Sequence, residues 1–291
     1  MKRVTKAVLP SGGLATRLLP VTKSVPKELL PVIDTPVLHH LLAEVRAAGL
    51  TDALVITGRG KDAIANHFDE DPELDRYLGD RAAGLLGDTR ELYESVTVHA
   101  VRQGGAKGMG HAVLRAEQHI GAMPFAVVTG DDLIDAGSGL LARMVDIQHE
   151  LGGVVLAVVE VADELVEVSD LVAAEPAGQD GLLRVTDIVK RPELSAAPSR
   201  LAVVGRYVLP PEVFDVLRGT PSDGGGEVQL PDAMVQLSRL GVPVHAVPFT
   251  GARYDVGTRL GLLQTSVLFG LQRPDLGPEL RRWLREVVRA D

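Results

Sequence analysis

The sequence predicts an α/β fold, built on a doubly wound, mostly parallel but mixed sheet with helices on both faces. Short apolar runs, several rich in β-branched residues, recur at 7–10, 53–57, 96–101, 125–129, 154–161, 201–209 and 244–249. Amphipathic stretches at 37–48 and 110–120, with apolar residues three and four apart, lie between the early runs. Strands that alternate with helices indicate a largely parallel sheet, whose ligands bind beyond the carboxyl ends of its strands.

The alternation is interrupted twice and ends in a helical segment. Residues 69–94 are rich in charge with irregular apolar spacing, and residues 163–200 contain a turn cluster with proline and glycine. We interpret both as insertions over one domain. An apolar run at 260–271 is followed by an amphipathic, arginine-rich segment. We therefore expect a single domain over residues 1–270 and a helical C-terminal arm over 271–291, which packs on its own domain or on a second subunit.

The composition excludes several classes of function. The chain has no cysteine, so disulfides and thiolate chemistry are excluded, and a hard cation such as Mg²⁺ suits the remaining ligand types. A formal charge of -9 offers no basic surface to nucleic acid, so no nucleic-acid partner is expected. The start of the chain lacks the pattern of a secretory signal, and no apolar run approaches about 18 residues. We expect a cytoplasmic protein with no membrane partner.

The segment directly after the first strand has the composition of a phosphate-binding loop. Gly12 and Gly13 let backbone amides approach an anionic ligand without an intervening Cβ. Residues 17–31 then combine three prolines with three basic residues, among them Arg17 and Lys27. A loop stiffened by proline holds cations at fixed positions, which suits the neutralisation of a triphosphate. Two glycines alone would be weak support, because tight turns often use glycine for steric reasons.

The same segment resembles the signature of the sugar-1-phosphate nucleotidylyltransferases. Residues 11–17 read Ser-Gly-Gly-Leu-Ala-Thr-Arg and residues 26–31 read Pro-Lys-Glu-Leu-Leu-Pro. Within that superfamily the chain is similar to the bacterial UTP-glucose-1-phosphate uridylyltransferases, with further similar segments at 66–69, 103–113, 197–207, 225–230 and 253–257. The resemblance implies a Rossmann-like nucleotidyltransferase fold and Mg²⁺-dependent transfer of UMP from UTP to α-D-glucose 1-phosphate. It also implies a homodimer or homotetramer.

The resemblance assigns roles to the cations and to the nucleotide-binding residues. Arg17 and Lys27 correspond to the triphosphate-binding and catalytic cations, which offset charge that develops on the α-phosphate and on pyrophosphate. The side chains of Glu28 and Gln103 correspond to groups that face the uracil edge, where buried donors and acceptors reject a base that leaves them unpaired. The backbone of the nucleotide site comes from Gly12, Gly13 and Gly108.

Two aspartates are expected to hold the metal ion. Asp131 follows the apolar run 125–129, which places it at the carboxyl end of a strand. By resemblance it corresponds to the first metal-binding aspartate of the family, and Asp255 corresponds to the second. Mg²⁺ takes one or two carboxylates together with phosphate oxygens, so this pair suits it. Turn or capping roles for Asp255 remain an alternative.

The sugar-binding positions depart from the family. Lys190 and Arg191 stand where the family has Glu-Lys, and Val172 lies near the position of a Tyr-Gly pair that touches the sugar. Lys190 can only donate hydrogen bonds, which reverses the sense of the interaction, whereas Arg191 can still hold a sugar phosphate and act as a catalytic cation. Further departures are Ala15, Thr258 and Pro231.

Three functions remain open at this stage. The first is uridylyl transfer to glucose 1-phosphate with rebuilt sugar contacts. The second is nucleotidylyl transfer to another sugar or cyclitol phosphate, for which an anionic group facing Lys190 is a natural partner. The third is a non-catalytic nucleotide-binding paralogue with a regulatory or interaction role. The combination of Arg17, Lys27, Asp131 and Asp255 argues against the third, and the choice between UTP and dTTP stays open.

Overall fold

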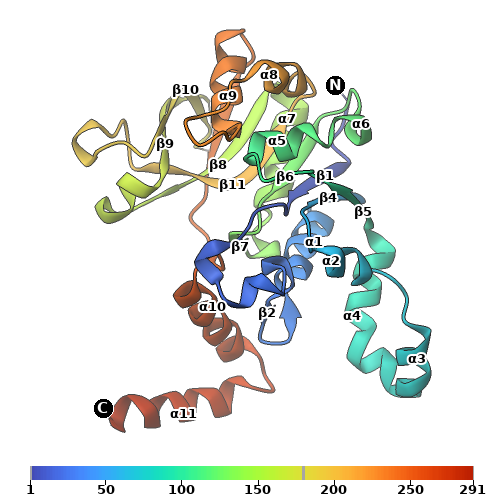
Figure 1. Cartoon of the computed structure of the whole chain (residues 1–291). Coiled ribbons are helices and arrows are strands. Elements are labelled where there is room, and N and C mark those ends of the chain that lie inside the picture. Colours follow the sequence, from blue (N-terminus) through green and yellow to red (C-terminus); the bar gives the residue numbers. More distant parts are fainter. Residues whose placement is uncertain (1, 179–180, 291) are drawn as a thin grey trace.

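A mixed sheet forms the centre of the protein, as Figure 1 shows. The computed structural model describes residues 2–178 and 181–290, and within them the main sheet has nine strands. In spatial order these are β5 (Thr97–Arg102), β4 (Asp52–Thr57), β1 (Lys6–Pro10), β6 (Phe125–Val128), β11 (Leu201–Leu209), β8 (Val154–Glu160), β12 (Val244–Pro248), β10 (Leu183–Lys190) and β9 (Asp170–Pro176). Two small ribbons accompany it, β2 (Pro31–Val32) with β3 (Thr35–Pro36) and β7 (Asp132–Ile134) with β13 (Arg253–Asp255).

The predicted α/β class and mixed sheet are confirmed, but parallel pairing is confined to part of the sheet. Strands β5, β4, β1 and β6 are parallel to one another, and β8 is parallel to β12. In contrast, β11 is antiparallel to β6 and β8, and β10 is antiparallel to β12 and β9. The prediction of a mostly parallel sheet is therefore wrong for the second half. A short connection such as that from β9 to β10 can join only antiparallel strands, whereas a parallel pair needs a longer crossover.

Helices cover both faces of the sheet because alternate strand residues point to opposite sides. Ala7 and Leu9 of β1 pack in one cluster with α1 and α7, and Val8 packs in a second cluster with α5, α8 and α9. The helices are α1 (Val37–Ala47), α2 (Asp62–Asn66), α3 (Pro72–Leu78), α4 (Ala82–Ser95), α5 (Met109–Leu114), α6 (Glu117–Ile120), α7 (Leu140–Leu151), α8 (Val213–Gly219), α9 (Leu230–Arg239), α10 (Arg259–Gln272) and α11 (Gly277–Ala290).

The segments expected to be insertions and a terminal arm have regular structure of their own. Residues 69–94 contain α3 and most of α4, and the end of the chain forms α10 and α11, which extend from the sheet in Figure 1. A few positions of the predicted ranges lie outside the described residues. These are Met1 of the 1–270 domain, Gln179 and Asp180 of the 163–200 insertion, and Asp291 of the 271–291 arm. Across the part of the chain that is described, no helix is both long enough and apolar enough to cross a membrane.

A buried ion pair ties the sheet to α1. Arg206 of β11 is 0% exposed, and its Nε and Nη2 donate to the Glu44 carboxylate of α1 at 2.8 to 3.0 Å. Its Nη1 donates to the carbonyl of Thr129 at 3.0 Å, and its Nη2 donates to the carbonyl of Asp132 at 3.0 Å. Because every one of these partners lies in the interior, the guanidinium fixes the backbone that follows β6.

A histidine cluster joins the 62–95 region to α1. His39 of α1 lies with its Nε2 2.7 Å from Nε2 of His67 and in hydrogen-bond contact with the Tyr93 hydroxyl of α4. Burial, together with the neighbouring His67 and His40, lowers the pKa of His39 to about 4. Burial also lowers the pKa of His67 and, against the charge of Asp34, that of His40. The folded protein therefore favours neutral imidazoles here.

Replacement of Glu44 by alanine should strongly destabilise the protein. Glu44→Ala leaves the buried Arg206 guanidinium without its counter-ion, and such a loss costs about 3–5 kcal/mol of unfolding free energy. Urea unfolding followed by circular dichroism measures the change. The matched control is Glu175→Ala, which breaks an ion pair with Arg184 whose two side chains are each 62% exposed, and which should cost under about 1 kcal/mol. Equal losses in both variants would contradict the proposed importance of Arg206.

Stability should fall as the pH is lowered from 6.5 toward 4, in part because of His39. The unfolded chain binds a proton at the ordinary pKa of 6.5, whereas the folded chain resists it until about 4. The contribution of His39 to the free energy of unfolding is thus fully present above pH 6.5. It falls by up to about 1.4 kcal/mol per pH unit as the pH is lowered toward 4, because the unfolded chain binds one more proton in this range. His39→Gln keeps a polar group opposite His67 and should make the decline shallower in urea titrations across this range. An unchanged slope would refute the assignment to His39.

Candidate active site

The glycine loop after β1 forms one wall of a cavity of about 480 Å³. A Cβ added to Gly12 would lie 2.0 Å from Oε1 of Gln103, so this position admits only glycine without movement of that side chain. A Cβ on Gly13 would meet nothing within 4 Å, which leaves its backbone open to the cavity. Six residues predicted for the site line this cavity: Gly12, Gly13, Lys27, Gln103, Gly108 and Asp131.

Gln103 connects the two glycine segments of the cavity. Its Nε2 donates to the carbonyl of Gly108 at 3.1 Å, and its side chain lies against Gly12. Gly108 has a φ of +88°, and a Cβ there would lie 2.5 Å from the carbonyl of Val228. Both features require glycine at position 108. Ala15, which replaces the second glycine of the family signature, also adopts a left-handed conformation with φ 51°, and its carbonyl accepts a hydrogen bond from Thr22.

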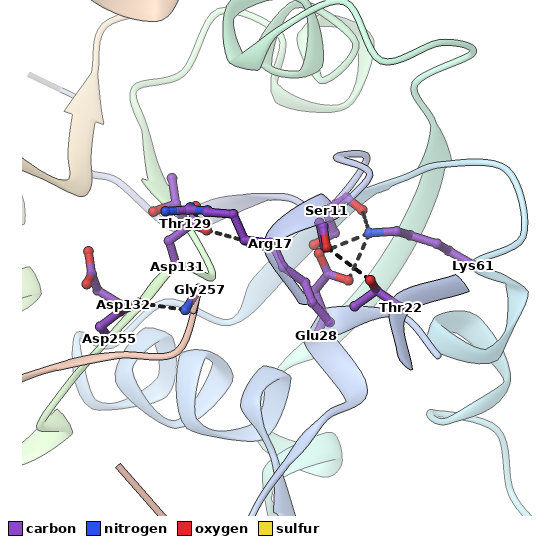
Figure 2. Close-up of polar contacts among 12 residues, drawn as sticks. Ser11, Arg17, Thr22, Glu28, Lys61, Thr129, Asp131, Asp132, Asp255 and Gly257 are labelled. Atoms are coloured by element: carbon purple, nitrogen blue, oxygen red, sulfur yellow. Dashed lines mark hydrogen bonds and ion pairs between the residues drawn. The ribbon is translucent and has the colours of Figure 1, made fainter. Parts of the chain in front are cut away.

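Two predicted cations converge on one carboxylate, as Figure 2 shows for Arg17. Nζ of Lys27 donates to Oδ1 of Asp131 at 2.8 Å, and Nη2 of Arg17 lies 3.5 Å from the same oxygen. Lys27 is 12% exposed, whereas Arg17 is 67% exposed and free to move toward a ligand. Partial burial raises the pKa of Asp131, but the charge and hydrogen bond of Lys27, followed by the charges of Arg17 and Lys61, outweigh burial and hold the pKa below its usual value.

The β7–β13 ribbon brings Asp255 to the same place. Asp255 pairs with Asp132, and the backbone N–H of Val256 donates to the carbonyl of Asp131 at 2.9 Å. The Asp255 carboxylate accepts from the N–H of Gly257 at 2.7 Å and from the Thr258 hydroxyl at 2.6 Å. Residues more than a hundred positions apart in the sequence thus meet at one end of the sheet.

Asp131 and Asp255 fit a hard divalent cation. A Cβ built on Gly257 would lie 3.0 Å from Oδ1 of Asp131, 3.3 Å from Nη2 of Arg17 and 3.4 Å from Oδ1 of Asp255, so the two carboxylates and the guanidinium flank one small region. Two carboxylates with room for phosphate oxygens and waters are the donor set that Mg²⁺ prefers. These two residues would hold the predicted ion.

Glu28 is buried and already paired. It is 1% exposed, and Nζ of Lys61 donates to its two carboxylate oxygens at 3.0 and 3.1 Å and to the carbonyl of Ser11 at 2.5 Å (Figure 2). Lys61 lines a second hollow, of about 510 Å³, that shares Gly12 and Gly13 with the cavity. Lys61 lies outside the motifs that predicted the other site residues. Its position just after β4, beside the glycine loop in a parallel sheet, is the signal that could have found it.

Two of the three predicted sugar-binding residues, Lys190 and Arg191, lie together in a separate cluster. Lys190, at the end of β10, pairs in register with Asp170 of β9, and its Nζ lies 2.5 Å from a carboxylate oxygen of Asp232 in α9. Arg191 has a left-handed φ of 40°, and its N–H donates to the carbonyl of Ser169 at 3.1 Å. Burial raises the pKa of Asp170 and the nearby Asp232 raises it further, against the charges of Arg191 and Lys190. Asp232 is a second residue of the site that no sequence motif predicted.

Val172 lies away from any open surface. It is 0% exposed, its side chain packs in the core, and its carbonyl accepts a hydrogen bond from the Ser199 hydroxyl at 2.7 Å. The structure therefore does not bring the Val172 side chain to the cavity or to the Lys190 cluster.

The cavity has the parts of a site for phosphoryl transfer. Open backbone at Gly13 can cradle a phosphate chain, Lys27 and Arg17 can neutralise it, and two carboxylates can hold a cation beside it. Phosphoryl transfer depends mainly on positioning and electrostatic stabilisation, so no side-chain nucleophile is required. The fold and site thus define a phosphoryl-transfer protein of the α/β class.

Comparison with known proteins gives the family. Residues 6–268 match the family model described as nucleotidyl transferase. The chain is 38% identical to the "UTP–glucose-1-phosphate uridylyltransferase YngB" of Bacillus subtilis (strain 168), over 100% of this chain and 97% of that one. It is 36% identical to the UTP–glucose-1-phosphate uridylyltransferase of Staphylococcus haemolyticus (strain JCSC1435), over 99% of each chain. It is also similar to the UTP-bound UGPase from Acinetobacter baumannii, with a TM-score of 0.89 and 36% identity over 97% of this chain and 99% of that chain. The chain belongs to the nucleotidyl transferase family.

Proposed function

We propose that the protein transfers UMP from UTP to a sugar 1-phosphate, with α-D-glucose 1-phosphate as the acceptor, and releases UDP-glucose and pyrophosphate. The observation that carries the proposal is the convergence of Lys27 and Arg17 on Asp131 at the glycine-loop cavity. The full-length similarity to uridylyltransferases and to a UTP-bound structure supports UTP as the nucleotide.

The nucleotide occupies the glycine-loop side of the site in this proposal. Backbone of Gly12, Gly13 and Gly108 surrounds the base and phosphates, and Gln103 presents an amide to the pyrimidine edge. The Glu28 carboxylate is the acceptor proposed for the N3–H of uracil, and the three N–H donors of Lys61 go to Glu28 and to the Ser11 carbonyl. Lys61 acts here as a positioning residue, since it holds the buried Glu28 carboxylate.

The reaction itself is a displacement at the α-phosphorus. An oxygen of the sugar phosphate attacks that phosphorus and forms a new P–O bond, while the bond to the bridging oxygen breaks and pyrophosphate leaves with its electron pair. Arg17 and Lys27 stabilise the charge on the leaving group, and Arg191 holds the sugar phosphate. The sugar phosphate is already an anion, so no general base is needed. Mg²⁺, when held by Asp131 and Asp255, supplies charge neutralisation at the phosphates.

The charge balance at Lys190 favours a neutral sugar. The Asp232 carboxylate lies 2.5 Å from Nζ of Lys190, so the lysine does not present an unpaired positive charge to an anionic substituent. Asp232 also supplies a hydrogen-bond acceptor close to the position where the family has a glutamate. The pair can therefore both donate to and accept from sugar hydroxyls.

The remaining expectations complete the proposal. Residues 1–270 act as one domain of doubly wound, Rossmann-like character in the β5–β4–β1–β6 half, with insertions at 69–94 and 163–200, and the protein works in the cytoplasm. The 271–291 arm, together with α10, contributes to a homodimer or homotetramer. Exposed apolar residues along the two helices support this role: Leu260, Leu263, Leu268, Trp283, Val287 and Val288.

Arg17→Ala should lower turnover by at least about 100-fold, because a cation that stabilises the leaving phosphates is lost. The side chain is 67% exposed, so the thermal unfolding transition should stay unchanged. Pyrophosphate release with Mg²⁺, UTP and glucose 1-phosphate measures the effect. Arg46→Ala, which removes an arginine of α1 paired with Glu91, is the control and should keep wild-type turnover. Normal turnover of Arg17→Ala would remove the proposed role.

Asp232→Asn should shift the preference of the enzyme toward an anionic sugar. The substitution frees the Lys190 ammonium, and a new charge-assisted hydrogen bond of about 1.5–3 kcal/mol raises kcat/KM for glucuronic acid 1-phosphate relative to glucose 1-phosphate by about tenfold or more. Asp215→Asn, an exposed aspartate of α8 paired with Arg218, is the control and leaves the ratio unchanged. A constant ratio in Asp232→Asn would show that Lys190 does not face the acceptor.

A further inference from the structure

A second group of ligand-type side chains lies at the opposite end of the sheet from the cavity. Asp52 is the first residue of β4, His99 lies on the edge strand β5, and His119 lies on α6, which precedes β6. The cavity residues, by contrast, follow the carboxyl ends of these parallel strands. One ligand atom from each of the three side chains lies within 4.8 Å of the other two. Figure 1 allows the reader to follow β4, β5 and α6 on the same side of the molecule.

The two imidazoles converge on one carboxylate oxygen. Nε2 of His119 lies 2.8 Å from Oδ1 of Asp52, and Nε2 of His99 lies 3.9 Å from the same atom. The ring centroids of the two histidines are 4.7 Å apart with an interplanar angle of 56°. A divalent ion held at about 2.0–2.2 Å by each ligand keeps ligand atoms about 3.5 Å apart in tetrahedral geometry. Side-chain shifts of less than about 1 Å would therefore complete such a site.

His99 lies near the carboxylate without a hydrogen bond to it. Its Nε2 is 3.9 Å from the Asp52 oxygen that His119 contacts, which is too long for a hydrogen bond. A cation placed between the three atoms would satisfy both imidazole nitrogens and the carboxylate oxygen together.

The donor set selects the class of ion. Two imidazole nitrogens with one carboxylate oxygen suit Zn²⁺ and similar divalent transition ions, whereas Mg²⁺ prefers oxygen ligands only. The group is partly exposed, with side-chain exposures of 46% for His99, 22% for His119 and 24% for Asp52. Water can therefore enter and complete the coordination.

Lys6 opposes the ion without blocking it. Its Nζ lies 3.5 Å from Oδ2 of Asp52 and donates to the backbone carbonyl of His119 at 2.7 Å. The lysine thus lies next to Oδ2 of Asp52, whereas both histidines lie near Oδ1, which remains available to bind an ion. Its positive charge must weaken the binding of a second cation nearby.

We propose that Asp52, His99 and His119 bind one divalent transition-metal ion of the zinc class, separate from the magnesium expected at Asp131 and Asp255. The ion joins β4, β5 and α6 at the edge of the sheet. Because the site lies at the amino ends of the strands, its role is to stabilise this edge, and transfer chemistry in the cavity does not require it.

The proposal can be tested with metal-free, tag-free full-length protein in excess Mg²⁺. Titration with Co²⁺, followed by visible absorption, should show one bound ion with a tetrahedral-type spectrum, and Zn²⁺ should displace it. His99→Ala and His119→Gln should each weaken binding by at least about tenfold. His149→Ala, which removes an exposed histidine of α7, is the matched control and should bind as the wild type does. Lys6→Met should tighten binding, because it removes the opposing charge.

His119→Gln keeps a polar group opposite Asp52, so its melting temperature without metal reports whether the fold is intact. Loss of Co²⁺ binding together with an unchanged metal-free melting temperature supports a ligand role. Equal Co²⁺ affinity in the wild type and both histidine variants, or no saturable binding in the wild type, overturns the proposal. Pyrophosphate release with Mg²⁺ should be the same in His99→Ala and the wild type, so this result is independent of the proposed transferase activity.

Discussion

The buried guanidinium of Arg206 is the interaction on which the active end of the sheet depends. A charge without water contact is tolerated only when its donors are satisfied, and here Glu44 supplies the counter-ion. The remaining donors hold the carbonyls of Thr129 and Asp132, which lie two residues before and one residue after Asp131. The position of the metal-ligand candidate is therefore set from inside the core, through Glu44 of α1 and Arg206 of β11.

That constraint explains how an exposed loop can present a defined charge pattern. Arg206 holds the backbone on either side of Asp131. The side chains of Lys27 and Arg17 both lie next to Oδ1 of the Asp131 carboxylate. In this state the two cations are partly neutralised by the carboxylate. An incoming phosphate chain must draw them toward itself, and the more exposed Arg17 can do so at lower cost than Lys27. Lys27 therefore keeps the site in place, whereas Arg17 can move toward the bound substrate.

The sequence predicts local features well and distant pairings poorly. The early alternation of strand and helix, and the aspartate at the end of β6, follow from patterns within a few residues. The antiparallel half of the sheet depends on strand order, which periodicity does not encode. Lys61 with Glu28, and Asp232 with Lys190, join residues 33 and 42 positions apart. The burial of Val172 depends on which face of β9 its side chain occupies. The register between β9 and its partner β10 shifts between Val185 and Asp187, and a sequence pattern within one strand does not encode such a shift.

The altered sugar half can still recognise a neutral sugar. Lys190 and Arg191 contribute two positive charges, and Asp170 and Asp232 contribute two carboxylates, so the cluster is formally balanced. Burial raises the pKa of Asp170, and the nearby Asp232 adds to this effect against the charges of Arg191 and Lys190. A balanced group of donors and acceptors binds hydroxyls through geometry rather than through net charge. The reversal of hydrogen-bonding sense at position 190 therefore does not by itself change the charge class of the acceptor, because Asp232 restores the acceptor that the lysine lacks.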